Sequence, residues 1–262
     1  MTDPTTPASL EAFLSRDSND TSQLISYRND NPTRTLKKSA DINLLIWNIF
    51  KGHLARSWDK LDSMHTQSDI IVLQEMVFNL KKKPEFYDNH PETYWSLGTS
   101  FTNKKGIHTG TAIGSDVHVL ETAFLTSPDL EPITGTPKSS MYQRYAIDQS
   151  EDTLLIANMH AINFTRITKF QRQIDSLCEA IRGHEGPMIV TGDFNTHFPA
   201  RTSYLVMRMN ELDLKLSLPE HDTRLFPYTH VFYRNVEVKN HQMIGGKRGS
   251  DHKPFVFSFQ LS

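Results

Sequence analysis

Runs of mostly apolar residues, each about the length of a β-strand, recur along the chain from residue 42 onward. We predict strands at residues 42–47, 69–75, 110–114, 117–125, 142–147, 153–160, 188–193, 229–238 and 255–259. Several of these runs are apolar at consecutive positions, which is typical of central strands that are covered on both faces. The pattern therefore predicts sheets that lie inside the molecule.

Two segments have the spacing of helices instead. Residues 57–67 place Trp58, Leu61 and Met64 on one face, and residues 166–183 repeat apolar residues at helical spacing. Helices between the early strands favour βαβ units, whereas the middle strands follow one another closely and favour antiparallel pairing. We therefore expect an α/β protein, a sandwich of mixed sheets with helices outside.

The first 40 residues differ from the rest of the chain. They are rich in Ser, Thr, Asp, Asn and Pro and contain two short helix-like segments at 10–13 and 24–27. We interpret residues 1–40 as a polar leader that packs on one domain spanning residues 41–262. Two later segments, 79–90 with three lysines at 81–83 and 128–140, have the composition of solvated loops.

Length and charge limit the alternatives only weakly. The 262 residues suit one large domain or two small ones, and a net charge of −2 gives no basic excess that would indicate a nucleic-acid binder. A local basic groove remains an alternative, because the net charge of the whole chain does not reveal it. The first residues have neither the basic nor the apolar segment of a secretory signal, and no run approaches the roughly 18 apolar residues of a membrane span, so we expect neither. We expect a cytoplasmic monomer without stable membrane insertion; export by a signal-less route stays an alternative.

Cys178 is the only cysteine of the chain. It excludes an intramolecular disulfide and a cysteine-based metal site. Its place in the predicted helix at 166–183 favours a small buried residue over the alternative, a redox-sensing thiol.

Polar side chains stand where several apolar runs begin or end. They are Asn48, Glu75, His160 with Asn163 soon after it, Asp193, Asn195, and the pair Asp251 and His252 just before the last strand. If the last strand runs antiparallel to the others, its start lies at the same sheet edge as their ends. Each residue alone is a common turn residue. Their joint placement predicts a site at one rim of the fold.

The stretch IVTGDFNTH, residues 189–197, brings two of these residues close together in sequence. If extended geometry persists past Gly192, Asp193 and Asn195 project to one side while Phe194 packs on the other. Gly192 leaves room for backbone or a ligand to approach closely.

The chemistry of the set favours a hard cation. Carboxylates and amides without thiols suit Mg²⁺ or Mn²⁺, and Glu75 is the best single ligand, with Asn48 and Asp251 near it. His160 and His252 suit the oxygens of a phosphate group. Asp193 can orient and deprotonate water, and Asn195 can donate its amide to a developing charge. The set predicts metal-assisted attack of water on phosphorus.

Other enzyme classes are less favoured. Ser250, Asp251 and His252 are consecutive, so they cannot form a catalytic triad among themselves. The chain has twelve histidines but no His-x-x-x-His pair on a helix, which speaks against a zinc hydrolase. It also lacks a Gly-x-Ser-x-Gly elbow and a phosphate-binding Gly-x-x-x-x-Gly-Lys-Ser/Thr loop.

The phrases LLIWNIFKG, IIVLQEM, LLIANMHAINF, MIVTGDFNTH and GSDHKPFVFSF occur in this order over residues 42–261. In this order they resemble the endonuclease/exonuclease/phosphatase superfamily, which has the DNase I-like fold. The phrase HAINF is most similar to small, poorly characterised bacterial members. The resemblance implies a four-layer sandwich, two mixed sheets between helix layers, and Mg²⁺-dependent cleavage of a phosphoester.

The resemblance also implies a role for each matching residue. Glu75 would bind metal with Asn48 beside it, Asp193 would position the water, Asn195 would steady the transition state, His160 would touch the scissile phosphate, Asp251 would assist at the metal, and His252 would bind phosphate or assist proton transfer. One position departs from the family pattern, because Thr229 stands where an Asp usually supports the last histidine. Without that carboxylate His252 is less well oriented and less easily kept protonated, unless Asp222 replaces it.

The resemblance leaves the substrate open, because the superfamily includes nucleases, inositol-phosphate phosphatases and sphingomyelinases. We expect Asn163, Lys247 and Arg248 to bind substrate, and Lys104, Lys105 and Lys138 are further candidates for the rim. A nuclease is the first prediction and a phospholipid or phosphoinositide hydrolase the second. The third is a non-catalytic module that keeps the pocket for binding, and Thr229 is the residue that supports it.

Overall fold

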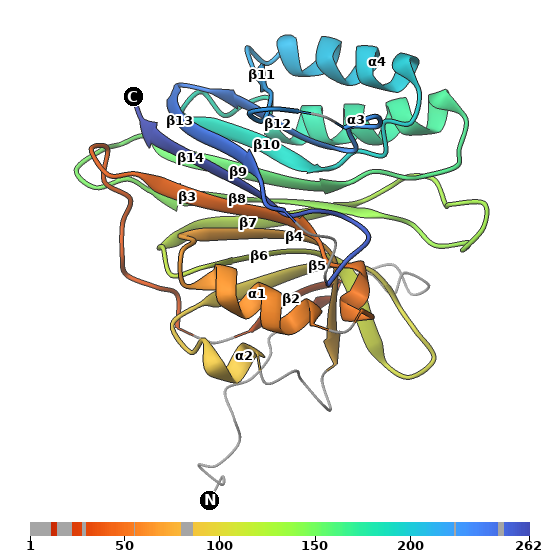
Figure 1. The fold of residues 1–262 in the computed structure, drawn as a ribbon, viewed down its shortest axis with the longest axis horizontal. Helices are drawn as coiled ribbons and strands as arrows, with labels where there is room; N and C mark the ends of the chain where they lie inside the picture. Colours follow the sequence, from red (N-terminus) through yellow and green to blue (C-terminus); the bar gives the residue numbers. More distant parts are fainter. Residues whose placement is uncertain are drawn as a thin grey trace, which may run out of the picture.

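Two β-sheets lie face to face between two layers of helices (Figure 1). The computed structural model describes residues 12–14, 23–27, 30–54, 56–79, 86–222, 224–245 and 249–262. The outer layers consist of α3 (Ile167–Ile181) and α4 (Pro199–Asn210) on one side and α1 (Ser57–His65) and α2 (Phe86–Asn89) on the other. This arrangement confirms the predicted four-layer α/β sandwich. Every helix in the described ranges is too short or too polar to cross a membrane.

One sheet is built around a parallel pair near its middle. β3 (Ile42–Asn48) and β4 (Ile70–Asn79) run parallel and are joined by α1, as predicted for the early strands. The other described strands pair antiparallel, in the order β1-β2-β5-β6-β4-β3-β14-β13. They are β1 (Ala12–Leu14), β2 (Gln23–Tyr27), β5 (Tyr94–Thr102), β6 (Ile107–Ser115), β13 (Val236–Met243) and β14 (Phe255–Leu261).

The second sheet repeats this plan. β9 (Thr153–His160) and β10 (Met188–Asp193) run parallel and are joined by α3. The described strands follow the order β11-β12-β10-β9-β8-β7, and their other pairs are antiparallel. They include β7 (Val119–Thr126), β8 (Ser139–Ala146), β11 (Lys215–Ser217) and β12 (Thr229–Arg234). Within each pair the two strands run in the same direction, and the ends of β3 and β10 meet through Asn48 and Asp193. All four strands therefore point toward one side of the sandwich.

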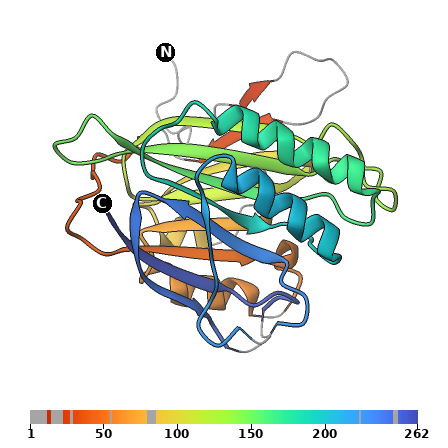
Figure 2. The same cartoon turned by 90° about the horizontal axis from the view of Figure 1, so that it is seen from above.

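Three apolar clusters hold the layers together. The first lies between the sheets and includes Ile46 and Ile156, both fully buried. The second packs α3 and α4 onto the six-stranded sheet through Phe170 and Leu205, and the third packs α1 onto the eight-stranded sheet through Leu61. Figure 2 shows α3 and α4 lying side by side across their sheet.

Cys178 lies on the buried face of α3 and is 1 % exposed. Burial raises the pKa of its thiol to about 11, so the thiol stays protonated near neutral pH. The prediction of a small buried residue is confirmed.

The helix-like interpretation of segments 10–13 and 24–27 is wrong where the structure describes them. β1 pairs antiparallel with β2, and β2 pairs antiparallel with β5, so both belong to the sheet. Ile25, 2 % exposed, packs in the cluster under α1. Runs of four or five residues are too short for spacing to separate helix from strand, and pairing with β5 decided the outcome. The boundary at residue 40 stays a prediction.

The predicted strand at 229–238 is two strands in different sheets. Asn235 has a φ of 53°, a left-handed conformation that Asn tolerates, and it turns the chain from β12 into β13. The predicted loop at 79–90 contains α2, whose Phe86 and Tyr87 are buried, while its three lysines lie outside the described residues. The predicted loop at 128–140 is not solvated throughout, because its Glu131 is only 7 % exposed.

Candidate active site

A cavity of about 250 Å³ opens where β3, β9 and β10 end and β14 begins, beside the middle of β4. Among the residues that line it are eight that the sequence singled out: Asn48, Glu75, His160, Asn163, Asp193, Asn195, Asp251 and His252. β14 runs antiparallel to β3, so its start lies beside the end of β3. Strands of both sheets therefore bring these side chains to one place.

Glu75 reaches the cavity through an irregularity in the middle of β4, which continues to Asn79 and does not end at Glu75 as predicted. Its φ is 53°, and the pairing of β4 with β6 shifts register between Leu73 and Met76. Such a bulge re-aims a side chain. The buried Glu75 Oε2 accepts no hydrogen bond from the described residues, although Lys51 Nζ lies 3.5 Å from it. Lys138 Nζ lies 3.9 Å from the other oxygen, Oε1. A buried anionic oxygen without a hydrogen-bond donor suits a cation.

Asp193 is held in a fixed orientation. Asn48 Nδ2 donates a hydrogen bond to its Oδ2 at 2.9 Å, and the backbone N–H of Asn195 donates to its Oδ1 at 3.1 Å. His160 Nε2 lies 3.9 Å and His252 Nε2 3.7 Å from Oδ2. The carboxylate therefore faces two imidazoles and is positioned by two N–H donors.

His160 lies deep in the cavity and is 4 % exposed. Burial, reinforced by the positive charge of Lys138, holds the pKa of its imidazole well below the ordinary value. Its Nε2 lies 3.9 Å from Glu75 Oε1, the same distance as from Asp193 Oδ2. A neutral imidazole in this place carries one N–H that can donate to a phosphoryl oxygen.

Asn195 reaches the cavity by a different path from the predicted one. β10 ends at Asp193, and Asn195 has a φ of 49°, so extended geometry does not persist past Gly192. The turn closes because the Asn195 N–H bonds to Asp193, as an Asx-type turn does. Its side-chain Nδ2 donates to the carbonyl of Ala161 at 2.8 Å. One amide proton remains for another acceptor.

The neighbours of this turn agree with the prediction. Phe194 is fully buried and packs edge-on against Phe232, away from the cavity. A Cβ on Gly192 would lie 2.0 Å from the carbonyl oxygen of Met159. Glycine is therefore needed for β10 to approach β9 this closely.

The start of β14 is fastened to the end of β3. Ser250 Oγ donates to the carbonyl of Asn48 at 2.6 Å and accepts from the His252 N–H at 3.1 Å. Trp47 Nε1 donates to the carbonyl of His252 at 2.9 Å. Asp251 is exposed at the mouth of the cavity. These bonds fix the backbone that carries Asp251 and His252.

Thr229 and Asp222 do not supply a carboxylate to His252. Thr229 is 7 % exposed and pairs with Asp193 across the ladder between β10 and β12. Asp222 forms a salt bridge with Arg224, whose Nη2 lies 2.7 Å from Asp222 Oδ2, and this bond lowers the pKa of Asp222. The suggested replacement by Asp222 is therefore wrong.

The predicted substrate-binding residues fall into two groups. Asn163 lines the cavity; its N–H donates to Glu131 Oε1 at 2.8 Å, and its Oδ1 lies 2.8 Å from His197 Nε2. Lys247 and Arg248 lie outside the described residues.

Three charged residues line the cavity in addition to the eight that the sequence singled out. Lys51 and Glu131 line it but were not predicted, since residue 131 falls in an expected solvated loop. Lys138, a candidate for the rim, also lines it, 3.5 Å from Glu131 Oε2. The other rim candidates, Lys104 and Lys105, lie in the turn between β5 and β6 and are not among the lining residues.

Two further residues hold the cavity wall from behind. Gln173 of α3 donates from Nε2 to the carbonyl of His160 at 3.0 Å and accepts from the N–H of Ile162 at 2.7 Å. Arg201 of α4, 3 % exposed, donates to the carbonyls of Ile162 and Asn195. The role of Gln173 is indicated in the sequence, because this residue is polar at a buried position of an amphipathic helix. No such sign of the role of Arg201 is present in the sequence.

Residues 45–252 match the model of the Endonuclease/Exonuclease/phosphatase family. The chain belongs to this family. Its members are typically phosphoesterase hydrolases and generally use divalent metals. The superfamily resemblance of the sequence is thereby confirmed.

Individual family relatives agree. A "UPF0294 protein" of Vibrio campbellii is 28 % identical over 235 residues, which cover 87 % of this chain and 81 % of the relative. It is one of the small, poorly characterised bacterial members that the sequence resembles. An endonuclease/exonuclease/phosphatase from Beutenbergia cavernae has a TM-score of 0.66 at 14 % identity, covering 85 % of this chain and 72 % of that one. The catalytic domain of human Nocturnin with bound sulfate has a TM-score of 0.61 at 19 % identity, covering 85 % and 94 %. At these identities the two structures show the fold alone.

Proposed function

We propose that the protein hydrolyses phosphodiester bonds with the help of Mg²⁺ or Mn²⁺. The observation that carries the proposal is the buried Glu75 Oε2, which lacks a hydrogen-bond donor in the described structure and shares a cavity with Asp193, His160 and His252. Oxygen donors without thiols suit a hard cation. The donor set therefore fits the metal that the family generally uses.

Three residues would hold the metal. Glu75 is the main ligand; Lys51 and Lys138 offset part of its charge. Asn48 Oδ1 accepts one hydrogen bond, from the N–H of Phe50 at 3.0 Å, and keeps a second lone pair. Asp251 assists from the mouth. When bound, the cation supplies Lewis-acid stabilisation of negative charge on the phosphoryl oxygens.

The side chains around the metal site perform the proton chemistry. Asp193, held by Asn48 and Asn195, orients a water molecule and takes its proton at Oδ2. The free amide proton of Asn195 and the N–H of neutral His160 donate to phosphoryl oxygens, where charge develops. His252 Nε2, 3.7 Å from Asp193 Oδ2, binds phosphate or protonates the leaving oxygen.

Exposed aromatic side chains at the mouth favour a single-stranded nucleic acid as the substrate. Phe164 lines the cavity, is 69 % exposed and stacks with His197 at an interplanar angle of 20°. An adjoining pocket of about 300 Å³, which also contains His252, is lined by Phe226 and Tyr228, stacked at 6°. Bases stack on such rings with little dependence on sequence.

Two aliphatic side chains favour a second candidate, a phospholipid or phosphoinositide hydrolase. Ile133 at the cavity is 76 % exposed and Leu225 at the adjoining pocket is 85 % exposed. Aliphatic groups around a phosphate site suit a headgroup presented by a lipid surface. They offer no flat ring for a base, so they do not serve the first candidate.

A substrate panel tests the proposal: single-stranded DNA, RNA, plasmid and abasic duplex DNA, and vesicles containing sphingomyelin or phosphoinositide, each with Mg²⁺, Mn²⁺ or EDTA. We expect metal-dependent cleavage of single strands that falls about a hundredfold or more in Glu75→Gln and in Asp193→Asn. The exposed carboxylate of Glu151 provides the matched control, Glu151→Gln, with unchanged activity. Phe164→Ala raises KM for single strands.

The other outcomes are equally informative. Turnover of vesicles alone establishes the lipid candidate. Tight binding of one substrate without turnover, with or without metal, contradicts the hydrolase and establishes the non-catalytic module. Activity that survives in both Glu75→Gln and Asp193→Asn contradicts the assigned site.

A further inference from the structure

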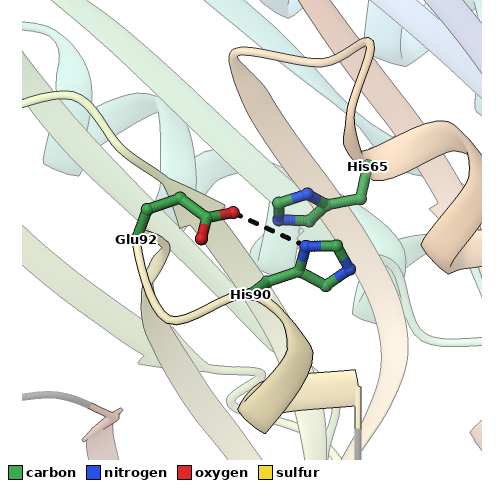
Figure 3. Close-up of side chains that lie close together, drawn as sticks. All are labelled: His65, His90 and Glu92. Atoms are coloured by element: carbon green, nitrogen blue, oxygen red, sulfur yellow. Dashed lines mark ion pairs between the residues drawn. The ribbon is translucent and has the colours of Figure 1, made fainter.

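Three side chains of metal-binding type gather outside the cavity (Figure 3). His65 is the last residue of α1, and His90 and Glu92 follow α2. The two imidazole rings stack with centroids 3.6 Å apart, and His90 Nδ1 lies 3.5 Å from Glu92 Oε1. One ligand atom from each residue lies within 4.8 Å of the others. For a single cation to contact all three, the ligand atoms must move closer together and the stacked rings must turn until their in-plane lone pairs meet at the ion.

We infer that this cluster binds a Zn²⁺ ion, with the fourth position taken by water. Two imidazoles and one carboxylate suit zinc, whereas Mg²⁺ prefers oxygen ligands only. Zinc–nitrogen bonds of about 2.0–2.1 Å in a tetrahedron place ligand atoms roughly 3.4 Å apart. The three side chains would close by about 1.5 Å at most.

Partners behind the two histidines support this inference. Asp62 Oδ1 lies 2.7 Å from His90 Nε2, and Thr93 Oγ1 lies 2.8 Å from His65 Nε2. A metal-binding histidine commonly bonds through its other ring nitrogen to a carboxylate or similar group, which fixes the ring. With Nε2 of His90 bound to Asp62, Nδ1 is the nitrogen that faces Glu92 and the ion.

Burial also prepares the cluster for a metal. Both histidines are 7 % exposed, whereas Glu92 is exposed, so an ion can enter from the side of Glu92.

The cluster is separate from the candidate active site. α1 begins at Ser57, which donates a hydrogen bond to the carbonyl of Gly249 near the cavity, and its axis carries His65 about 12 Å away. The chain then enters β4 at Ile70, five residues of extended strand before Glu75. A metal here would fasten the end of α1 to the turn before β5. The inference is independent of the proposed function.

Calorimetric titration of the metal-free full chain with Zn²⁺, in excess Mg²⁺, tests the site. We expect one Zn²⁺ per chain and a higher Tm with Zn²⁺ for the wild type, Glu75→Gln and the control Glu151→Gln. Glu92→Gln and His90→Asn should bind Zn²⁺ at least about tenfold more weakly and lose the rise in Tm. Glu92 is exposed, so its variant stays informative if His90→Asn fails to fold.

Three results would overturn the inference. The wild type binds no Zn²⁺ in excess Mg²⁺, Glu92→Gln binds it as tightly as the wild type, or Glu75→Gln loses the binding. The last result would place the zinc in the cavity instead. The first two results leave the test of phosphodiester hydrolysis with Mg²⁺ or Mn²⁺ unaffected.

Discussion

Asn48 donates a hydrogen bond from Nδ2 to Asp193 Oδ2 across 2.9 Å and thereby joins the ends of two strands that belong to different sheets. Asn48 ends β3, and Asp193 ends β10. Both side chains are nearly fully buried, at 3 % and 1 % exposed. The bond links the residue expected beside the metal to the residue expected to activate water, so the separation of the two parts of the site depends on how the sheets pack.

Asn48→Ala tests this link. Removing the donor frees Asp193 to rotate, so we expect kcat to fall about tenfold to a hundredfold, with a smaller change in KM. The free energy of unfolding should fall by about 1–3 kcal/mol because a buried carboxylate oxygen loses its donor. Steady-state kinetics and urea unfolding measure the two effects.

Asn43→Ala is the matched control, because Asn43 lies at the other end of β3, where its Oδ1 accepts a hydrogen bond from Ser258 at 2.6 Å. It should lose stability without a loss of kcat. Equal kcat in Asn48→Ala and the wild type would show that the bond does not orient Asp193 for catalysis.

Arg201 is expected to position Asn195 without contacting substrate. Its guanidinium donates to the carbonyls of Ile162 at 2.9 Å, Asn195 at 3.1 Å and Thr165 at 3.0 Å. Lysine cannot reproduce this planar set of donors. Arg201→Lys should lower the free energy of unfolding by about 1–3 kcal/mol and lower kcat more than it raises KM.

Arg172→Lys provides the comparison, because Arg172 is exposed on α3 and pairs with Asp129 at the surface. Its free energy of unfolding should change by less than about 0.5 kcal/mol, with kcat unchanged. A loss of stability in Arg201→Lys with unchanged kcat would show that Arg201 stabilises the fold but does not position Asn195 for catalysis.

His230 should make the fold sensitive to acid. Burial lowers its pKa from 6.5 to about 4. Between these two values the unfolded chain binds a proton that the folded chain does not, so the free energy of unfolding falls as pH falls from about 6.5 toward 4. From pH 7 to pH 5 this group alone contributes a loss of about 2 kcal/mol. His241, whose pKa burial also lowers to about 4, adds a slope of the same sign.

His230→Gln isolates the effect, because the amide can still donate to Thr196 Oγ1, which lies 2.8 Å from His230 Nε2. Urea midpoints at pH 7 and pH 5 should differ less in the variant than in the wild type. An equal loss in both proteins would show that His230 does not titrate in this range.

Runs of apolar residues were sufficient to predict most of the described strands, and the polar residues at their ends predicted the rim on which the candidate site lies. β5 was missed because polar side chains occupy buried positions: Ser96 accepts a hydrogen bond from Gln143 of the facing sheet, at 3.0 Å. Buried polar side chains such as Ser96 interrupt the apolar run by which a strand is predicted, whereas β8, which carries Gln143, was predicted. α4 was missed as well, and with it Arg201.

The directions in which individual side chains point could not be predicted from the sequence. The bulge that turns Glu75 into the cavity depends on its pairing with β6, and the left-handed turn at Asn195 is stabilised by a bond to Asp193. Neither changes the hydrophobic pattern. Likewise, His65 and His90 belong to segments that only the packing of α1 against α2 and its following turn brings together.

Thr229→Asp should restore a carboxylate where the family usually has one. Thr229 and His252 line the same adjoining pocket, so an acid at 229 lies on the side from which it can orient the imidazole and favour its protonated form. We expect kcat to rise by about tenfold, because an oriented and protonated imidazole is the better general acid. Thr229→Asn is the control, with the same shape and no charge. Because Thr229 pairs with Asp193, two carboxylates then face each other, and a loss of stability should accompany the gain. If both variants match the wild type in kcat, another group already orients His252.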